Sequence, residues 1–302
     1  MAELSIGDAV GAGFGVIRRR PVAVLIWGLL QTAMLGAMVA VMAPMYLAMF
    51  AEVAKNAGHA PTPDVANMMR MQGTVWLLNV VTIFVATILY CAVFRSLIHP
   101  EQGRFGYLRL GMTEVILYLL MVGAYIAFVV ATFILMIPAA LIVGVLVAVH
   151  ATAAAVIVGI VLGLGALWGL VYVALRFSMI GPMMVDDGKV HFLDAWALTK
   201  GRAGALFLMT LCLFGILIAL ELVLVAIVAI VGASVLSSVA GAASAIPALF
   251  SQPPAVVFSD LTPFFVIFGA AAIPLYGAFL AILGAPWARA YLDFRVDPAA
   301  VF

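Results

Sequence analysis

Six long uninterrupted stretches of apolar residues constrain this chain more than any other feature of its sequence. A helix needs roughly 20 apolar residues to cross a hydrocarbon core about 30 Å thick, and each stretch reaches that length. Of the 302 residues, 67% are hydrophobic and only 9% are charged, which excludes an ordinary soluble domain. The expected spans are residues 21–48, 74–94, 115–148, 153–175, 203–232 and 263–285. The sequence therefore predicts an all-α integral membrane protein, with residues 1–302 forming a single six-helix domain.

The number of spans is open only over Val115–Leu175, which could hold two long helices or three short ones. Lys and Arg decide between them, because these residues accumulate in cytoplasmic loops. With two spans there, twelve basic residues fall on the cytoplasmic side, and only Lys55 and Arg70 fall on the other side. Three spans would reverse the side of six of the twelve. We therefore expect six spans with the N-terminus and the C-terminus both cytoplasmic.

The turn between the third and fourth spans has two candidate positions. His150 and Thr152 interrupt the apolar run, which favours a turn at Val149–Thr152 and leaves helices of similar length. Pro138 then lies inside the third helix, where it should produce a kink because it removes a backbone hydrogen bond. The alternative places the turn at Pro138 itself.

The spans form three successive pairs with related ends. In each second helix a Tyr precedes a Pro by ten residues, as in Tyr90–Pro100, Tyr172–Pro182 and Tyr276–Pro286. A Pro can end a helix, because it pushes the preceding residue out of the helical region. The pattern predicts three parallel-repeat hairpins, related by a pseudo-threefold axis along the membrane normal.

A short polar segment precedes the first helix of each pair. The first, Ser5–Val16, begins with Ser5 and Asp8 in the spacing of a capping box. The second is Phe105–Leu110, and the third is Phe192–Lys200, which is followed by Gly201. We expect all three to be short amphipathic helices that lie along the cytoplasmic interface.

One region resembles a known family. It comprises Arg176–Gly188, with an Asp-Asp-Gly turn, followed by Phe192–Gly201, which contains an Ala-Trp-x-Leu-Thr-x-Gly pattern. This region resembles bacterial multi-pass proteins grouped with the membrane domain of glycerophosphoryl diester phosphodiesterases and with related uncharacterised families. The resemblance implies a multi-pass fold in a bacterial cytoplasmic (inner) membrane. It implies no catalytic residues here, because the family's enzymatic members carry their chemistry in an appended soluble domain.

Glu221 is the most unusual residue, because it lies well inside the fifth span. An ionised carboxylate near the bilayer centre costs on the order of 2.5–3.5 kcal/mol, so we expect Glu221 to face the bundle interior or to be protonated. It is a candidate intramembrane proton or cation site. The simpler interpretation is a neutral carboxyl group that bonds to a neighbouring helix.

Two further sets of residues carry hypotheses. The fourth span holds two Gly-x-x-x-Gly pairs, formed by Gly159 with Gly163 and by Gly165 with Gly169. Such pairs allow close helix packing, here either within the chain or against a second copy. Four basic residues on the cytoplasmic side could contact anionic lipid headgroups. They are Arg176, Lys189, Lys200 and Arg202.

The sequence shows no pattern that is typical of an enzyme or a cofactor site. The four histidines are scattered, the two cysteines lie inside spans, and neither set has metal-ligand spacing. We therefore expect no catalytic residues, no cofactor and no metal, and a net charge of +1 gives no reason to expect a nucleic-acid partner. The expected partners are membrane lipids, and either another membrane protein or a second copy. Three functions remain open: a non-catalytic scaffold, partner subunit or lipid-interacting component; a transporter or channel for a small or amphiphilic substrate; and a membrane-embedded lipid enzyme.

Overall fold

The structure, a computed structural model, describes residues 5–55, 65–240, 256 and 262–295. Six of its helices are long and apolar enough to cross a membrane, as the sequence predicts, and the described residues contain no strand. In chain order the elements are α1 (Ile6–Arg19), α2 (Pro21–Lys55), α3 (Val65–Ile98), the 3-10 turn η1 (Arg104–Tyr107), α4 (Met112–Ala148), α5 (Thr152–Phe177), α6 (Ile180–Asp187), α7 (Phe192–Leu198), α8 (Ala203–Ala240) and α11 (Thr262–Arg295).

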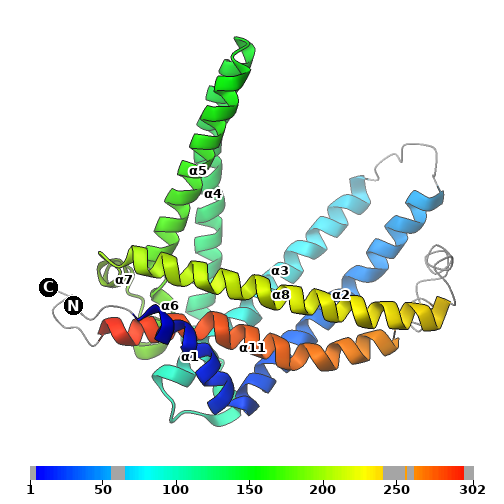
Figure 1. Cartoon of the computed structure of the whole chain (residues 1–302), viewed down its shortest axis with the longest axis vertical. Coiled ribbons are helices and arrows are strands. Elements are labelled where there is room, and N and C mark those ends of the chain that lie inside the picture. The colour runs from blue at the N-terminus through cyan, green and yellow to red at the C-terminus, as the bar shows by residue number, and fades with distance from the viewer. Residues whose placement is uncertain (1–4, 56–64, 241–255, 257–261, 296–302) are drawn as a thin grey trace.

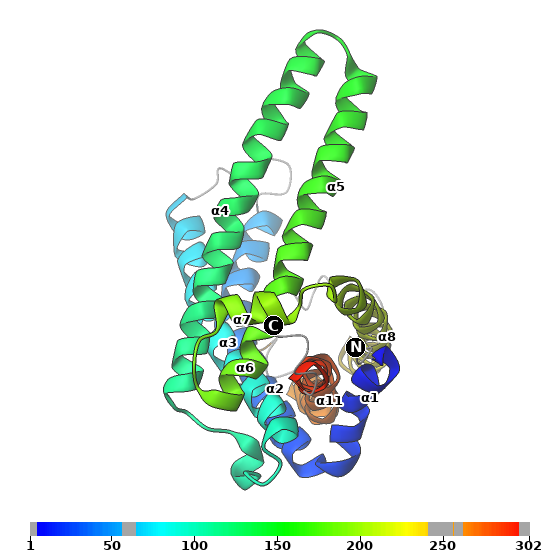
Figure 2. The same cartoon turned by 90° about the vertical axis from the view of Figure 1, so that its left-hand side faces the viewer.

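The long helices fan out in pairs from one end of the molecule (Figure 1). At that end the short elements α1, η1, α6 and α7 meet the adjoining ends of the long helices, and we call this region the base. Away from the base, α4 and α5 continue alone as a projecting pair, which we call the α4–α5 arm (Figure 2). The fan therefore leaves the long helices packed mainly where they enter the base.

Helix α11 is the centre of the packing, since it contacts α1, α2, α3 and α8. It crosses α2 where Gly28 faces Gly277. A Cβ atom added to Gly28 would lie 1.8 Å from the carbonyl oxygen of Ile273, and one added to Gly277 would lie 2.1 Å from that of Val24. Only a residue without a side chain permits this approach, so the two glycines set the position of the crossing.

The helices do occur as the three expected successive pairs, but the pairs pack differently. Helix α4 packs mainly against α5, whereas α2 packs most extensively against α11, which belongs to the last pair. The threefold repeat therefore stays a prediction.

The turn between α4 and α5 lies at Val149–Ala151, which confirms the position expected from His150. His150 adopts a left-handed backbone conformation there, with φ of 59°. Pro138 lies inside α4, as expected for this choice of turn.

Two of the three short helices expected before the spans are present, and their position at the membrane interface stays a prediction. Helix α1 begins after Ser5, whose hydroxyl accepts a hydrogen bond of 3.3 Å from the Asp8 amide. Helix α7 forms within the third segment, and Gly201 follows it with φ of +75°. The prediction for Phe105–Leu110 is wrong, because Phe105, Gly106 and Tyr107 all have positive φ and form a left-handed turn.

The prediction that Pro286 ends the last helix is also wrong, because α11 continues to Arg295. The residues beyond Pro286 include Ala288, Ala290 and Phe294, all buried in the base. Burying apolar side chains there offsets the backbone hydrogen bond that proline removes.

Candidate functional site

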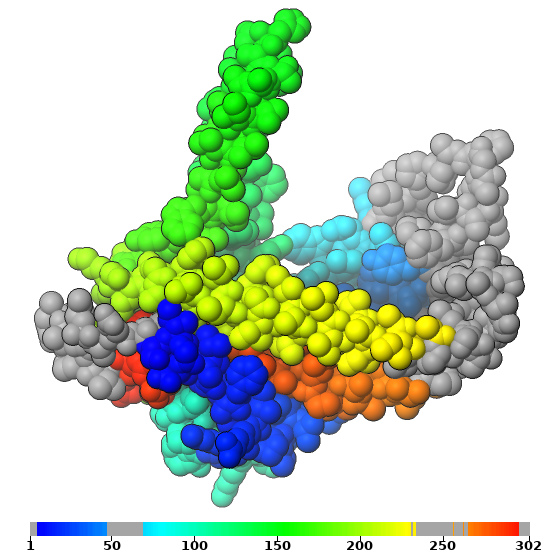
Figure 3. All heavy atoms as spheres, viewed as in Figure 1, coloured from blue at the N-terminus to red at the C-terminus, as the bar shows by residue number. Residues whose placement is uncertain are grey.

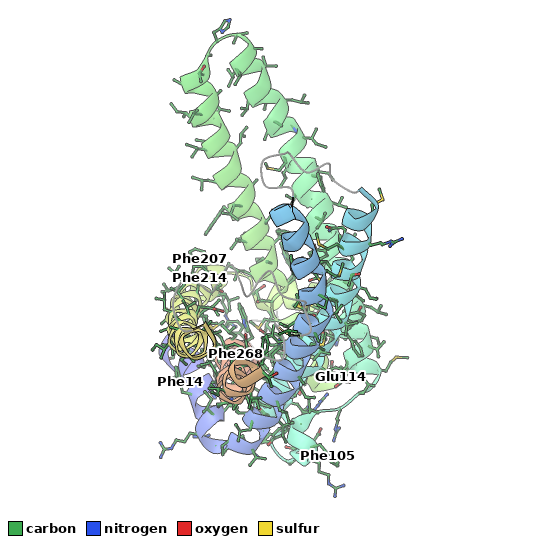
Figure 4. All side chains as sticks on the ribbon, turned by 90° about the vertical axis from the view of Figure 1, so that its right-hand side faces the viewer. Phe14, Phe105, Glu114, Phe207, Phe214 and Phe268 are labelled. Carbon is green, nitrogen blue, oxygen red and sulfur yellow. The ribbon has the colours of Figure 1, made fainter. Side chains whose placement is uncertain are left out.

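A buried ion pair joins the ends of α3 and α4. Arg95 lies in the last turn of α3 and Glu114 in the first turn of α4, and their side chains are only 7% and 2% exposed. The guanidinium donates to Glu114 Oε1 and, at 2.8 Å, to the carbonyl oxygen of Tyr107. Glu114 Oε2 accepts from the Gly111 amide at 2.9 Å. Because both charges are paired and hydrogen-bonded, the pair can remain inside the base (Figure 4).

This pair is not apparent from the sequence. Arg95 is one of the twelve basic residues on the cytoplasmic side of the predicted topology, and the third predicted span begins at residue 115, after Glu114. The sequence does contain a clue to this pair. Arg95 and Glu114 carry opposite charges on either side of one short connection between two spans, and such a connection can bring them together.

Side-chain hydrogen bonds tie the left-handed turn at Phe105–Tyr107 to neighbouring segments. The indole Nε1 of Trp27 on α2 donates to the Gly106 carbonyl at 2.7 Å, and the Tyr107 hydroxyl donates to the Pro100 carbonyl at 3.1 Å. These bonds offset the cost of three successive residues with positive φ. The turn leaves Phe105 86% exposed at the tip of the base (Figure 4).

A second polar cluster centres on Asp186 at the end of α6. Its Oδ2 accepts from the Tyr291 hydroxyl at 2.7 Å and from Arg295 at 2.6 Å, both on α11. Its Oδ1 lies 3.7 Å from Nε2 of His99, just after α3. This carboxylate therefore links three segments that are distant in the sequence.

Arg176 is the predicted basic residue with the most distinctive surroundings. It lies in the last turn of α5 and is only 3% exposed. Its guanidinium lies over the ring of Trp196 on α7, 4.4 Å from the centroid. Its Nε is buried and has no hydrogen-bond partner among the residues that the structure describes. The Thr199 hydroxyl donates to the Arg176 carbonyl at 3.0 Å, which fixes α7 against the end of α5.

The other three predicted basic residues do not join Arg176 in one cluster. Lys189 and Lys200 are exposed. Arg202 lies over the ring of Phe294 on α11, 4.4 Å from the centroid. The structure therefore separates two exposed lysines from two arginines that stack on aromatic rings.

One of the two expectations for Glu221, that it faces the bundle interior, is wrong, because Glu221 is exposed on α8. The other, that it is protonated, stays a prediction. Among the described side chains of α8, Leu206, Met209 and Leu213 are buried, all nearer its start. Beyond them Ile216 and Leu220 still pack partly against the core, whereas Glu221 itself is exposed. No hydrogen bond or ion pair of Glu221 occurs within the described part of the chain.

The glycines of α5 do not hold helices together within this chain. A Cβ added to Gly159 would lie 3.5 Å from a Val143 methyl on α4, and one added to Gly163, Gly165 or Gly169 would meet nothing within 4 Å. Gly165 and Gly169 instead line an apolar groove between α4 and α5. The alternative, packing against a second copy, stays a prediction.

His191 connects α6 and α7 at the surface. Its two ring nitrogens lie 2.7 Å from carboxylate oxygens of Asp187 and Asp194. These hydrogen bonds, first to Asp187 and then to Asp194, raise the pKa of His191 above its usual value of 6.5. No group of three potential metal ligands occurs among the described residues.

Comparisons with protein-family models, with curated proteins and with solved structures found no match to this chain. The residues behind the family resemblance nevertheless have structural roles here. Gly188 ends α6 with φ of 75°, Trp196 stacks on Arg176, and Thr199 bonds to the end of α5.

Proposed function

We propose that this protein is a non-catalytic multi-pass membrane component that acts as a scaffold, as a partner subunit or through contact with lipids. The observation that carries the proposal is the contrast between a base joined by specific polar contacts and long helices with uncovered apolar surface. In the described base, Arg95 and Asp186 use their hydrogen bonds to connect helix ends. The uncovered faces of the long helices remain available to lipids or to other membrane helices (Figure 3).

The orientation that we propose has the base, and with it both termini, in the cytoplasm of a bacterium. Basic residues support it, because the arginines at residues 18–20, 95, 104, 109, 176 and 202 all belong to the base or to the loops beside it. Lys and Arg accumulate on the cytoplasmic side of inner-membrane proteins. We also propose the relationship to the membrane domain of glycerophosphoryl diester phosphodiesterases, on the Arg176–Gly201 region alone.

Native mass spectrometry of the protein released gently from its own membrane tests this function. We expect a second polypeptide, a second copy of this chain or a phospholipid to remain bound at fixed stoichiometry. A bare chain that turns over a lipid substrate would contradict the proposal.

A transporter for a small or amphiphilic substrate is the second candidate, and Glu221 is the observation that favours it. A carboxyl group exposed on an apolar helix could bind a proton or a cation. Flux measured in proteoliposomes would support this function if Glu221→Gln abolished it. Absence of flux for wild-type protein across proton and cation gradients would count against it.

A further inference from the structure

Arg176 and Arg95 are both buried arginines at helix ends, but within the part of the chain that the structure describes only Arg95 of the two has a counter-charge. Arg95 pairs with Glu114 and also bonds to a backbone carbonyl. Arg176 is equally buried, at 3% exposure, yet no acidic side chain pairs with it among the described residues. An arginine stays charged in proteins, so burial without a counter-charge is unfavourable and an anion at this position would offset that cost.

The surroundings of Arg176 hold its guanidinium in a fixed position. Trp196 covers one face of the guanidinium, and the Thr199 hydroxyl bonds to the Arg176 carbonyl. Stacking on an aromatic face leaves the N–H groups at the guanidinium edge free to bond in the plane. Because Nε is one of these donors and lacks a partner in the described residues, the guanidinium presents a preorganised edge.

A planar guanidinium edge matches a phosphate group best, because two parallel N–H donors can bond two phosphate oxygens at once. The location also suits a lipid. Arg176 ends a span, and the ring of Trp196 packs beside Phe177 and Tyr172, with centroids 5.2 Å and 6.4 Å away. Tyr and Trp gather at the headgroup level of membranes, and Trp196 itself remains 37% exposed.

We propose that the Arg176 guanidinium, held on Trp196, binds the phosphate group of an anionic phospholipid at the base of the molecule. This inference deepens the proposed function and rests on its lipid-contacting form. Lys189 and Lys200 are outside this site. Both are exposed, and among the described residues neither stacks on an aromatic ring that would hold its charge in place.

The test uses the full-length chain in nanodiscs of phosphatidylcholine, with and without phosphatidylglycerol. Native mass spectrometry counts retained phosphatidylglycerol, and the thermal unfolding midpoint is measured in the same discs. The variants are Arg176→Gln, Arg176→Lys and the matched control Lys189→Gln, which removes the same charge from an exposed position in the same region.

We expect phosphatidylglycerol to raise the unfolding midpoint of wild-type protein and of Lys189→Gln, and to remain bound to both. Arg176→Gln should weaken retention by about 10-fold or more, because it removes charge-assisted bonds, and should abolish the rise in midpoint. In phosphatidylcholine alone, whose phosphate is already neutralised by its own choline, Arg176→Gln should change the unfolding midpoint much less than in discs that contain phosphatidylglycerol. Arg176→Lys keeps the charge without the planar edge, so it should retain less lipid than wild type. If Arg176→Gln does not fold, lipid retention by Arg176→Lys tests the site instead.

The outcomes separate the site from the function. Equal retention and equal midpoint shifts in wild type, Arg176→Gln and Arg176→Lys would overturn the site, although the protein would still contact lipid. Wild-type protein that retains no phosphatidylglycerol would overturn both the site and the lipid-contacting function. Inorganic phosphate added to phosphatidylcholine discs is the remaining arm. An Arg176-dependent shift with inorganic phosphate but not with phosphatidylglycerol would overturn the lipid and identify a soluble phosphate compound as the ligand.

Discussion

Helices α11 and α5 have similar apolar sequences but very different surroundings. In the most apolar window of α11, 33% of the residues are buried, against 6% in α5 and 0% in its neighbour α4. Both α11 and α5 contain glycines within their spans. Gly277 of α11 meets the backbone of α2, whereas Gly163, Gly165 and Gly169 of α5 meet nothing within 4 Å.

This difference shows that small residues promote packing only where a partner presents a matching surface. Between apolar helices in a membrane there is little hydrophobic driving force, so association depends on close fit and on polar contacts. The α2–α11 crossing has glycine on both helices, and the base adds the Arg95–Glu114 pair. In the α4–α5 arm, Gly163, Gly165 and Gly169 meet no facing backbone, and the surface of the arm stays uncovered (Figure 3).

Removing one partner of the buried ion pair should produce the largest effect. Glu114→Ala leaves Arg95 buried without its counter-charge, and we expect a loss of about 3–5 kcal/mol of stability. The measurement is thermal or denaturant unfolding in a mild detergent. The double variant Arg95→Met/Glu114→Leu removes both charges and should recover most of the loss. Stability unchanged by Glu114→Ala would mean that the pair does not hold the base together.

Filling the α2–α11 crossing should be the next largest effect. Gly28→Ala puts a methyl group 1.8 Å from the Ile273 carbonyl oxygen, so the helices must separate, at a cost of about 1–3 kcal/mol or more. The same unfolding assay measures it, and disulfide cross-linking between cysteines introduced into α2 and α11 near the crossing should become slower.

Gly165→Ala is the matched control in the arm. Nothing lies within 4 Å of the added methyl group, so within one chain the change should be neutral, or stabilising by up to about 1 kcal/mol through helix propensity. A large loss of stability or a change in oligomeric state would instead indicate that the α5 glycines pack against a second copy. The glycines of α5 would then pack against a partner, as Gly277 of α11 does, and the two helices would no longer differ in this respect.

Trp27→Phe tests a smaller contact that belongs to the base alone. It removes the 2.7 Å bond to the Gly106 carbonyl, and an unsatisfied buried acceptor costs about 1–3 kcal/mol. The left-handed turn should open more often, so trypsin should cleave faster after the exposed Arg104 and Arg109. Equal cleavage rates in variant and wild type would show that other contacts hold the turn.

The smallest effect is a local dependence on pH at the α6–α7 connection. Hydrogen bonds to Asp187 and then Asp194 raise the pKa of His191 above 6.5. A raised pKa in the folded state gives stability that is complete below the unfolded value and is lost as pH rises through the folded one. Amide protection near His191 should therefore fall as the pH rises from below 6.5 through the raised pKa of His191, as measured by hydrogen exchange. His191→Gln should flatten this dependence, and an unchanged profile in that variant would assign it to another group.

Much of the fold could be predicted because its signals are local. The lengths of the apolar stretches specify the six long helices, Ser5 caps α1, and His150 marks the turn before α5. The left-handed turn at Phe105–Tyr107 could not be predicted in the same way. Its conformation depends on Trp27, which lies 79 positions from Gly106 in the sequence.

The candidate site, too, could be predicted from the sequence only in part. The sequence picked out Arg176 as a basic residue at a span end, but only the structure buries it against Trp196 without a counter-charge in the described chain. Glu221 was expected to face inward or to be protonated, because an ionised carboxylate is costly near the bilayer centre. It lies exposed although its neighbour Leu220 still packs partly against the core, and no local pattern reports which face of a uniformly apolar helix finds a partner.

The sequence by itself determined which six segments form the long helices and where the chain turns between α4 and α5. Hydrophobic length and turn chemistry act over neighbouring residues, so the order of residues alone is enough to fix them. The tertiary structure decided which helices touch, which glycines meet a backbone and which charges find partners. Those outcomes depend on the shapes of surfaces far apart in the chain, and among uniformly apolar helices a few positions such as Gly28, Gly277, Arg95 and Glu114 decide them.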